Sequence, residues 1–408
     1  MFRKLTHRVF RDPIHGYINI HEQVIWDCIN SKEFQRLRRI KQLGASHQVY
    51  QTAEHSRFSH SLGVYEITRR MFEEVKGLAD LVTNYDQTVT LLAALLHDLG
   101  HGPFSHTFES VSRIDHEKYT ELIILGDTEI NAILSAIDTR LPHQVASIIN
   151  HSHPNKILTQ LVSSQLDADR MDYLLRDAYF TGTSYGSFDL NRLIRTMRVS
   201  GERLVIKESG IHAVEDYIMA RYHMYWNVYF HATSRAYEAV LYALFRRLDD
   251  LKESDLLDKY PRLKTFLVEE VPRVESLLAL DEAVMIYYFS EMQSSEDPIL
   301  RDLSTRLLNR QLFAYEDIED DVIEAEVIKM LEANNLDPRY YLAKDTLGQT
   351  PYHPYEKETS MLIYIIGRDQ EVKELSEVSE IVAAISAGKE KKESKIFYPK
   401  IKKVGAYE

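Results

Sequence analysis

The sequence has 408 residues, of which 44% are hydrophobic and 27% charged, and its formal net charge is −13. This composition is ordinary for a globular protein, and no apolar run approaches the roughly 20 residues that a membrane span needs. The acidic balance makes nucleic acid an improbable partner, because a nucleic-acid-coating surface needs a basic face, but it leaves room for a pocket that binds a small anion. The N-terminus is too polar for a secretion signal, and the single cysteine, Cys28, excludes an internal disulfide. Together these features favour a reducing, cytoplasmic location without a membrane partner.

The predicted class is mainly α, with small β elements at the N-terminus, near 200–207 and in the C-terminal region. Residues 1–26 alternate as strands do and contain two turn signals. Gly44 is the predicted stop of the first helical stretch, and Ser59 is a candidate N-cap. The apolar, and therefore buried, helix that ends at Gly100 is the clearest of the set. Helices are predicted over 31–43, 59–76, 87–99, 116–125, 129–137, 143–150, 156–178, 211–249 and 316–332. The lysine-rich tail from 389 to 403 is predicted to be either a loose strand or an arm.

Seven of the seventeen histidines fall between residues 47 and 116. A lone helical histidine is more often filler than a ligand, but here the arrangement raises the odds. His97 and Asp98 stand at the end of the buried helix, where an unpaired carboxylate is costly and needs a cation. His60 from another helix and Asp169 from the 156–178 helix complete a set of two imidazoles and two carboxylates. This set predicts a divalent metal, with Mn, Fe, Ni, Zn or Co favoured over Mg or Ca alone.

The helix that carries Asp169 has a polar and aromatic face. Asp169, Tyr173 and Asp177 are spaced i, i+4, i+8, and Arg170 lies beside them. A structural helix would present an apolar stripe at these positions. The face therefore suits a ligand.

The same spacing recurs at Arg221, Tyr225 and Tyr229. An aromatic core stripe explains the two tyrosines equally well when they are taken alone. The arginine at the head of the stripe favours an anion site with tyrosines that wall a sugar or a base.

A glycine- and proline-marked turn follows the His97-Asp98 pair and delivers more histidines towards it. His101 and His106 lie in this turn, and Glu109 and His116 follow. A histidine oriented by a carboxylate can hold a raised pKa and donate a proton to a leaving oxygen.

With these motifs in order, the sequence resembles the HD-domain phosphohydrolase superfamily, whose pattern is H…HD…D. The resemblance is strongest to the deoxynucleoside triphosphate triphosphohydrolases, a branch that includes bacterial dGTPase-like enzymes and the vertebrate SAM-and-HD-domain protein. It covers roughly residues 8–250. The matching segments are DPIHG at 12–16, FQRLR at 34–38, KQLG at 41–44, RFSHSLGV at 57–64, HDLGHGPFSH at 97–106, DADRMDY at 167–173 and RD at 176–177.

The resemblance implies an enzyme that hydrolyses deoxynucleoside triphosphates to a 2′-deoxynucleoside and intact triphosphate, with Mg accompanying the nucleotide. It implies His60, His97, Asp98 and Asp169 as metal ligands. His106 would protonate the 5′ oxygen, supported by Glu109 and His116. The substrate contacts it implies are Arg57, His101 and Arg170 at the phosphates and Tyr173 and Arg221 along the triphosphate chain. Gln42 and Asp177 would hold the 3′-hydroxyl, and Leu43 and Tyr229 would crowd the 2′ position. Tyr225 stands where relatives have histidine and would contact the phosphate or base end.

The resemblance also implies regulation by an activating deoxynucleotide, such as dGTP, bound between subunits of a homotetramer. Asn30 stands where the vertebrate relative has an aspartate, so base discrimination at that site should be weaker. The positions that match this site are Arg8, Val9, Asn30, Gln35 and Arg38, with Arg192 and His231 at a neighbouring nucleotide contact.

Three regions are expected: an N-terminal segment with a regulatory or interface role over 1–50, an HD catalytic domain over 51–250, and a C-terminal assembly or regulatory region over 251–408. Two alternatives remain open. One is another HD enzyme, such as a cyclic-nucleotide or alarmone phosphodiesterase, which gives no reason for Gln42, Tyr173 and Asp177. The other is a non-catalytic nucleotide sensor or nucleic-acid scaffold, against which the intact ligand set argues.

Overall fold

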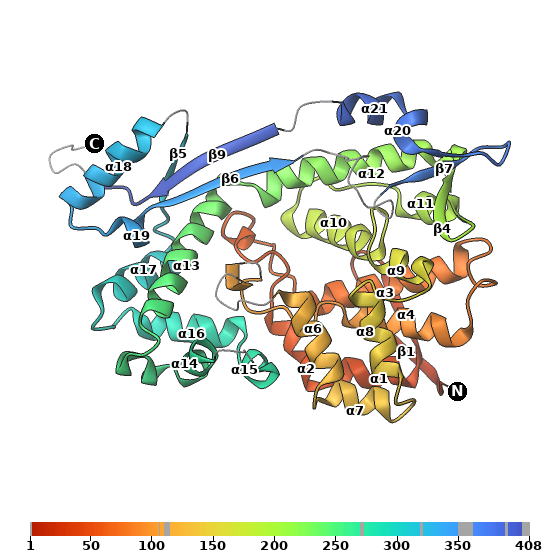
Figure 1. Ribbon diagram of the computed structural model, residues 1–408, viewed down its shortest axis with the longest axis horizontal. Helices are drawn as coiled ribbons and strands as arrows, with labels where there is room; N and C mark the ends of the chain where they lie inside the picture. The colour runs from red at the N-terminus through yellow and green to blue at the C-terminus, as the bar shows by residue number, and fades with distance from the viewer. Residues whose placement is uncertain are drawn as a thin grey trace.

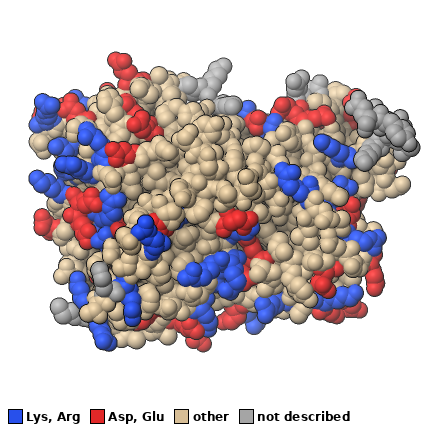
Figure 2. Space-filling model, turned by 180° about the vertical axis from the view of Figure 1, so that it is seen from behind, with Lys and Arg blue, Asp and Glu red and all other residues tan. Residues whose placement is uncertain are grey.

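A computed structural model describes residues 2–105, 107–109, 115–269, 273–318, 321–349, 362–387 and 391–401. These residues form a mainly α architecture with three small sheets, as predicted (Figure 1). No helix among them is both long and apolar enough to span a bilayer. On the face drawn in Figure 2, Lys and Arg side chains are interspersed with Asp and Glu, so the charge there is mixed.

The N-terminal segment forms an antiparallel hairpin, which confirms the predicted strands. The predicted helix over 31–43 is wrong beyond Arg39, because the next residues become extended. The backbone of residues 40–42 instead pairs with residues 55–57, through Gln42 N–H to the His55 carbonyl and Arg57 N–H to the Ile40 carbonyl. The elements are β1 (Lys4–Asp12), β2 (Gly16–Glu22), α1 (Gln23–Asn30), α2 (Lys32–Arg36) and the 3-10 turns η1 (Leu37–Arg39) and η2 (Ser46–Gln48).

The helical core is built around α3, which packs against both α4 and α10. Val64, Leu92 and Leu174, one from each helix, are fully buried there. These three helices also carry the polar residues of the site, so the core fixes the spacing of the site. The helices of this part are α3 (Arg57–Glu74), α4 (Asn84–Leu96), α6 (His116–Leu125), α7 (Glu129–Ser135), α8 (Leu141–Ile149), α9 (Lys156–Val162) and α10 (Ala168–Thr181).

Capping explains where the observed helix boundaries differ from the predicted ones. The predicted helix over 156–178 is two helices, because the Asp167 side chain accepts the Arg170 N–H and starts α10 anew. Ser59 is not an N-cap, since α3 begins two residues earlier, after Ser56. A capping box of Thr83 and Asp86 starts α4 earlier than predicted.

The next part runs from a short helix through a hairpin to two long helices. The predicted hairpin near 200–207 is confirmed. The predicted single helix over 211–249 is wrong, because a π-helical turn interrupts it and the Phe230 N–H bonds the carbonyl of Tyr225 five residues back. The elements are α11 (Leu190–Thr196), β3 (Met197–Ser200), β4 (Arg203–Lys207), η3 (Glu208–Gly210), α12 (Ile211–Met224), the π turn η4 (Tyr225–Tyr229) and α13 (Ala232–Asp250).

The C-terminal region combines helices that pack on α13 with one whole three-stranded sheet and two strands of the four-stranded sheet. The lysine-rich tail forms β9 in the middle of the antiparallel order β5-β9-β6, while β7 joins β4 in parallel. The division of the chain near residue 250 stays a prediction. The elements are η5 (Asp255–Lys259), α14 (Pro261–Val268), α15 (Val274–Leu278), α16 (Glu282–Met292), α17 (Pro298–Leu308), β5 (Ala314–Asp317), α18 (Asp321–Ala333), α19 (Pro338–Tyr341), β6 (Ala343–Gln349), β7 (Tyr364–Ile366), β8 (Val372–Glu374), α20 (Leu375–Val378), α21 (Glu380–Ser386) and β9 (Lys391–Tyr398).

One buried carboxylate connects this C-terminal region to two loops in the N-terminal third of the chain. Glu282, at the start of α16, accepts the backbone N–H of Lys41 at 2.9 Å and that of Phe104 at 3.3 Å. The side chain is 6% exposed, and burial raises its pKa to about 7. Glu282 therefore holds the loop before Gln42 and the turn after Gly102 in fixed positions.

We expect Glu282→Gln to change stability in a pH-dependent way. Because the folded pKa lies above the ordinary value, the parent loses stability as pH rises from about 4.5 to about 7, whereas the glutamine keeps an acceptor oxygen and does not titrate. The free energy of unfolding of Glu282→Gln relative to the parent should thus rise by about 3 kcal/mol between pH 4.5 and pH 8, as measured by urea denaturation.

The control is Glu332→Gln, which removes an exposed carboxylate on α18. Glu282→Ala should be less stable than the parent at both pH values, because two backbone N–H groups lose their acceptor. A pH-independent difference between Glu282→Gln and the parent would contradict the assignment.

Candidate metal and nucleotide site

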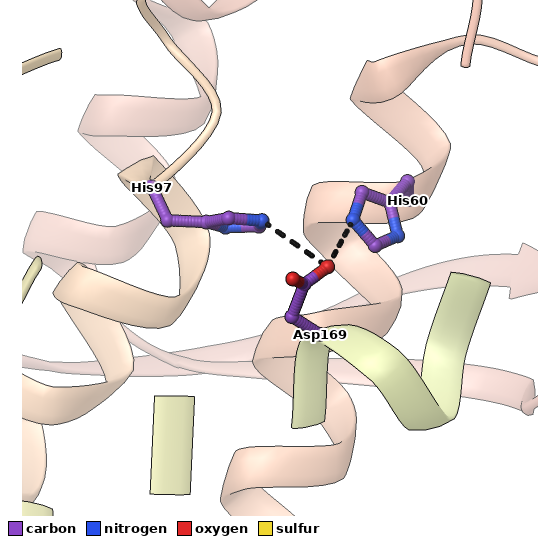
Figure 3. A group of neighbouring side chains, drawn as sticks. All are labelled: His60, His97 and Asp169. Atoms are coloured by element: carbon purple, nitrogen blue, oxygen red, sulfur yellow. Dashed lines mark hydrogen bonds and ion pairs between the residues drawn. The ribbon is translucent and has the colours of Figure 1, made fainter. Parts of the chain in front are cut away.

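Three side chains from three helical elements converge on one point (Figure 3). Asp169 lies in the first turn of α10, and its Oδ1 is 3.0 Å from His60 Nε2 and 3.7 Å from His97 Nε2. Ligand atoms of the three residues all lie within 4.8 Å of one another. The other ring nitrogen of His97 bonds the Ala94 carbonyl, which points Nε2 into the group.

The donor set fits a cation. His97 Nε2 is buried and has no hydrogen-bond partner among the described residues. Burial alone would lower the pKa of His60, but the Asp169 and Asp172 carboxylates raise it to about 10. The strong proton binding means that the surrounding carboxylates stabilise a positive charge at this buried position. A bound metal cation would be stabilised by the same carboxylates.

Asp98 lies at the edge of this group. Its Oδ1 is 3.3 Å from His97 Nε2, while its Oδ2 accepts a 2.6 Å hydrogen bond from Arg57 and is 3.8 Å from His60 Nε2. Burial would raise the pKa of Asp98, but the Arg57 guanidinium holds it well below its usual range. Asp98 is therefore an anion beside the ion position, with one oxygen already engaged.

Sequence reasoning missed the carboxylate that orients His60. Asp172 Oδ2 is 2.8 Å from His60 Nδ1, and Asp172 Oδ1 is 2.6 Å from His15 Nε2. Arg176, one turn along α10, donates to both oxygens of Asp172 and also to Asp12 at 2.8 Å. A carboxylate on the far nitrogen of a metal-ligating histidine fixes its tautomer and its direction. Asp12 and His15 belong to the DPIHG segment and Asp172 to the DADRMDY segment, but the sequence alone does not show that these two segments contact each other.

Gly63 makes this contact feasible. A Cβ at position 63 would stand 1.8 Å from Asp172 Oδ1 and 2.6 Å from Arg176 NH2. Any side chain there would displace the buried ion pair, so the helix needs glycine at this point.

The candidate ligands His60, His97, Asp98 and Asp169 are called the metal group below. A cavity of about 400 Å³ opens beside it and is lined by Arg57, which bonds Asp98. It is within the size range of small-molecule sites. Gln42 presents a buried Oε1 that lacks a hydrogen-bond partner among the described residues. Asp177 accepts a hydrogen bond from the Tyr229 hydroxyl at 2.8 Å and lies 2.7 Å from His55. Of the predicted substrate residues, those lining the cavity are Gln42, Leu43, Arg57, Tyr173, Asp177, Tyr225 and Tyr229.

The other predicted phosphate residues contact neighbouring side chains. Arg170 bonds Asp167 at 3.2 Å, one turn before it, and Arg221 bonds Gln165 at 2.7 Å. The Arg221 guanidinium lies 5.8 Å from the Tyr225 ring, and its Nε is buried without a partner among the described residues. Both arginines thus flank the aromatic wall but are not among the residues that line the cavity.

The predicted proton-transfer group is present in part. His116 Nδ1 is 2.6 Å from Glu109 Oε1, and the His116 ring stacks on that of His101 with centroids 3.8 Å apart. Burial and the Arg57 charge hold the pKa of His101 well below its usual value, so this imidazole is neutral. His106 lies outside the described residues.

Most of the predicted regulatory residues lie on the N-terminal elements. Arg38 stacks over Phe58 at 3.5 Å and donates to Gln35 at 2.9 Å. Asn30 donates to the Trp26 carbonyl, and Arg8 lies 5.3 Å from the Trp26 ring. The remaining predicted positions are exposed Val9 on β1, Arg192 on α11, which bonds the Ser209 carbonyl, and His231, which caps α13.

Two family models match this chain. The HD domain matches residues 57–177, and the HD associated region matches residues 188–260. The first match spans the whole metal group. The second begins just before α11 and ends at the start of α14.

Relatives match over most of the chain. Uncharacterized protein YwfO of Bacillus subtilis is 46% identical over 401 residues, which is 96% of this chain and 92% of that protein. Uncharacterized protein MJ1154 of Methanocaldococcus jannaschii is 31% identical over 91% of this chain and 74% of its own length. The deoxynucleoside triphosphate triphosphohydrolase SAMHD1 homolog of Dictyostelium discoideum is 30% identical over 62% of this chain and 51% of its own length.

Solved structures share the whole fold. A phosphohydrolase from Bacteroides thetaiotaomicron superposes with a TM-score of 0.85 at 28% identity, covering 97% of this chain and all of that one. A hypothetical protein from Aquifex aeolicus superposes with a TM-score of 0.76 at 32% identity, covering 97% of each chain. The likeness therefore extends through the C-terminal region.

We expect Asp172→Asn to weaken metal binding while all three clustered ligands remain. The amide cannot accept from His60, His15 and Arg176 together, so His60 loses its fixed direction. Loss of such an orienting contact costs about 10- to 100-fold in metal affinity. Isothermal titration calorimetry of the metal-free protein with Mn²⁺ measures this loss of affinity. Asp80→Asn, an exposed change, is the matched control. Unchanged Mn²⁺ affinity in a variant that melts cooperatively would refute the orienting role.

Proposed function

Because the chain belongs to the HD-domain phosphohydrolase superfamily, in the branch that contains the SAMHD1-like proteins, we propose that it hydrolyses deoxynucleoside triphosphates to a deoxynucleoside and inorganic triphosphate. The observation that carries this proposal is the position of Gln42. Its buried acceptor has no partner among the described residues, and it lines a nucleoside-sized cavity beside the metal group. A sugar hydroxyl would supply the missing donor.

The chain offers distinct contacts for each part of such a substrate. A divalent ion held by His60, His97, Asp98 and Asp169, with Mn, Fe, Ni, Zn or Co suited to these ligands, would supply Lewis acidity and a bound water of lowered pKa. Mg would accompany the nucleotide. Arg57 sits between Asp98 and the cavity and can meet a phosphate oxygen. Phosphates would therefore lie at the metal end.

The sugar would lie between Gln42 and Asp177, both of which can accept from a 3′-hydroxyl. Leu43 and the Tyr229 ring close the cavity on the side where a 2′-hydroxyl would stand, and Tyr229 is held there by its bond to Asp177. A ribonucleotide would have to displace this pair. Steric exclusion of this kind discriminates strongly, because a clash costs more than a lost contact.

Hydrolysis breaks the bond between the α-phosphorus and the 5′ oxygen, and the departing oxygen needs a proton. We assign that proton to His106. The bond between Glu109 and His116, with His101 stacked on His116, supports a proton-transfer group at this end of the site. In this proposal the phosphates contact His101, Arg170 and Arg221, and Tyr173 and Tyr225 lie along the triphosphate chain.

We expect the purified protein to release triphosphate from deoxynucleoside triphosphates far faster than from ribonucleoside triphosphates. Tyr229→Ala should narrow this gap by about tenfold or more, because it removes the ring that excludes the 2′-hydroxyl. Chromatography of the products after incubation with Mn²⁺ or Mg²⁺ measures both rates.

Tyr229→Phe is the matched comparison: it keeps the ring but loses the bond to Asp177, so it should keep more of the discrimination than Tyr229→Ala. Equal parent rates on GTP and dGTP would refute the sugar assignment. Release of pyrophosphate, or cleavage only of a cyclic nucleotide or an alarmone, would favour the other HD activities.

We also propose that the enzyme is a homotetramer activated by a deoxynucleotide, with dGTP the first candidate. The N-terminal positions Arg8, Val9, Asn30, Gln35 and Arg38 would hold the activator, with Arg192 and His231 at a neighbouring contact. The aromatic stacking of Arg8 and Arg38 supports this, because it orients two cations on neighbouring elements.

We expect added dGTP to increase hydrolysis of dATP and to shift the protein to a larger assembly in light scattering. Asn30→Asp should sharpen the preference for dGTP as activator, because a carboxylate accepts from both guanine donors and an amide offers one acceptor. A fully active monomer that responds to no nucleotide would contradict this model.

A further inference from the structure

The cavity beside the metal group does not end at the sugar contacts. Its far end is lined by Arg235 and Glu238 of α13 and by Asp345 and Leu347 of β6. The same four residues line a second cavity of about 490 Å³ between α13 and β6. They therefore stand at the junction of the two cavities, and the elements that carry them, α13 and β6, are labelled in Figure 1.

Arg235 at this junction already has its charge satisfied. Its side chain is 3% exposed and bonds Asp345 at 2.7 Å and Glu393 at 3.0 Å, and it lies over the Phe397 ring. It fixes β6 and β9 against α13. Because two carboxylates hold it, Arg235 gives the far end no free positive charge.

Glu238, by contrast, has no hydrogen-bond partner among the described residues. Burial raises its pKa to about 7, and Asp345 raises it further against the opposing effect of Arg235. The side chain is half-buried and lines the cavity, so its carboxylate can accept hydrogen bonds from a ligand's N–H groups.

The cavity is electrically polarised along its length. The metal group and Arg57 make one end cationic when the ion is bound. At the other end Arg235 is paired with Asp345, and Glu238 adds an acidic group, so that end offers a triphosphate no uncommitted positive charge among the lining residues. A nucleotide therefore enters with its phosphates towards the metal and its base towards α13 and β6.

From this arrangement we propose that Glu238 reads the hydrogen-bonding edge of the substrate's base and favours guanine over thymine. This inference rests on the proposed function. Guanine presents N1–H and an amino group side by side, which match the two oxygens of one carboxylate. Thymine presents a single N–H between two carbonyl oxygens, and those oxygens repel a carboxylate. Adenine and cytosine, each with one amino donor beside a ring acceptor, fall between the two.

The test is internal competition between dGTP and dTTP in one reaction mixture at pH 8, above the Glu238 pKa of about 7, so that the side chain is ionised. Both substrates meet the same enzyme in the same state of activation, so the ratio of their depletion rates gives the ratio of their kcat/KM values. We expect Glu238→Gln to lower the dGTP:dTTP ratio on the order of tenfold, because the amide accepts one guanine donor, opposes the other and can pair with thymine. Glu238→Ala should lower the ratio too, through loss of the guanine contact. Glu332→Gln, an exposed change on α18, should leave the ratio as in the parent.

The outcomes separate the inference from the proposed function. If the parent releases no triphosphate from any deoxynucleotide, the proposed function fails and the inference falls with it. If the parent is active and the ratio in Glu238→Gln and Glu238→Ala stays within twofold of the parent, Glu238 does not read the base. A uniform loss of rate on both substrates, with the ratio kept, would assign Glu238 a structural role and also overturn the inference.

Discussion

The buried Asp172 carboxylate is the interaction on which the rest of the site depends. Charges without exposure to water require partners, and Asp172 satisfies three cationic or donor groups at once: His60, His15 and Arg176. Arg176 in turn holds Asp12, so the N-terminal hairpin is fastened to α10. Gly63 is the steric condition for this network, because no other residue lets α3 approach Asp172. One hydrogen-bonded network around Asp172 therefore both orients His60 and attaches the N-terminal hairpin to α10.

The sequence was informative wherever one residue type had a single good explanation. An HD pair at the end of an apolar helix predicted a cation site, and the fold brings His97 together with His60 and Asp169. The mainly α class, the N-terminal strands and the hairpin near 200–207 followed from periodicity and turn residues. Boundaries failed where local side-chain bonds decided them, as at Asp167, which starts a new helix inside an apparently continuous pattern. The π turn over 225–229 was also missed, since the segment contains neither glycine nor proline and so carries no residue that signals a break in a helix.

Contacts between distant segments were beyond the reach of single-sequence reasoning. Nothing in the text around Glu282 says that it accepts N–H groups from Lys41 and Phe104, because both are about 180 residues or more away. The same holds for Arg235, whose partners Asp345 and Glu393 lie on two strands of the C-terminal sheet. The sequence does not identify the partner of a buried glutamate or arginine; the partner becomes known only from the fold.

These long-range contacts change how the C-terminal region is understood. Sequence reasoning set the region apart as an assembly or regulatory element, yet α16 holds the loops at Lys41 and Phe104, and β6 supplies part of the cavity wall. A cavity walled by α13 and β6, whose residues Arg235 and Asp345 are 110 positions apart in the sequence, responds to any shift of β6 against α13. The bond between Arg235 and Asp345 spans this boundary, so the position of β6 and the shape of the far end of the cavity are physically linked. Any event that moves the C-terminal sheet would therefore alter the far end of the cavity before it reached His60, His97 and Asp169, which the α3, α4 and α10 core holds independently.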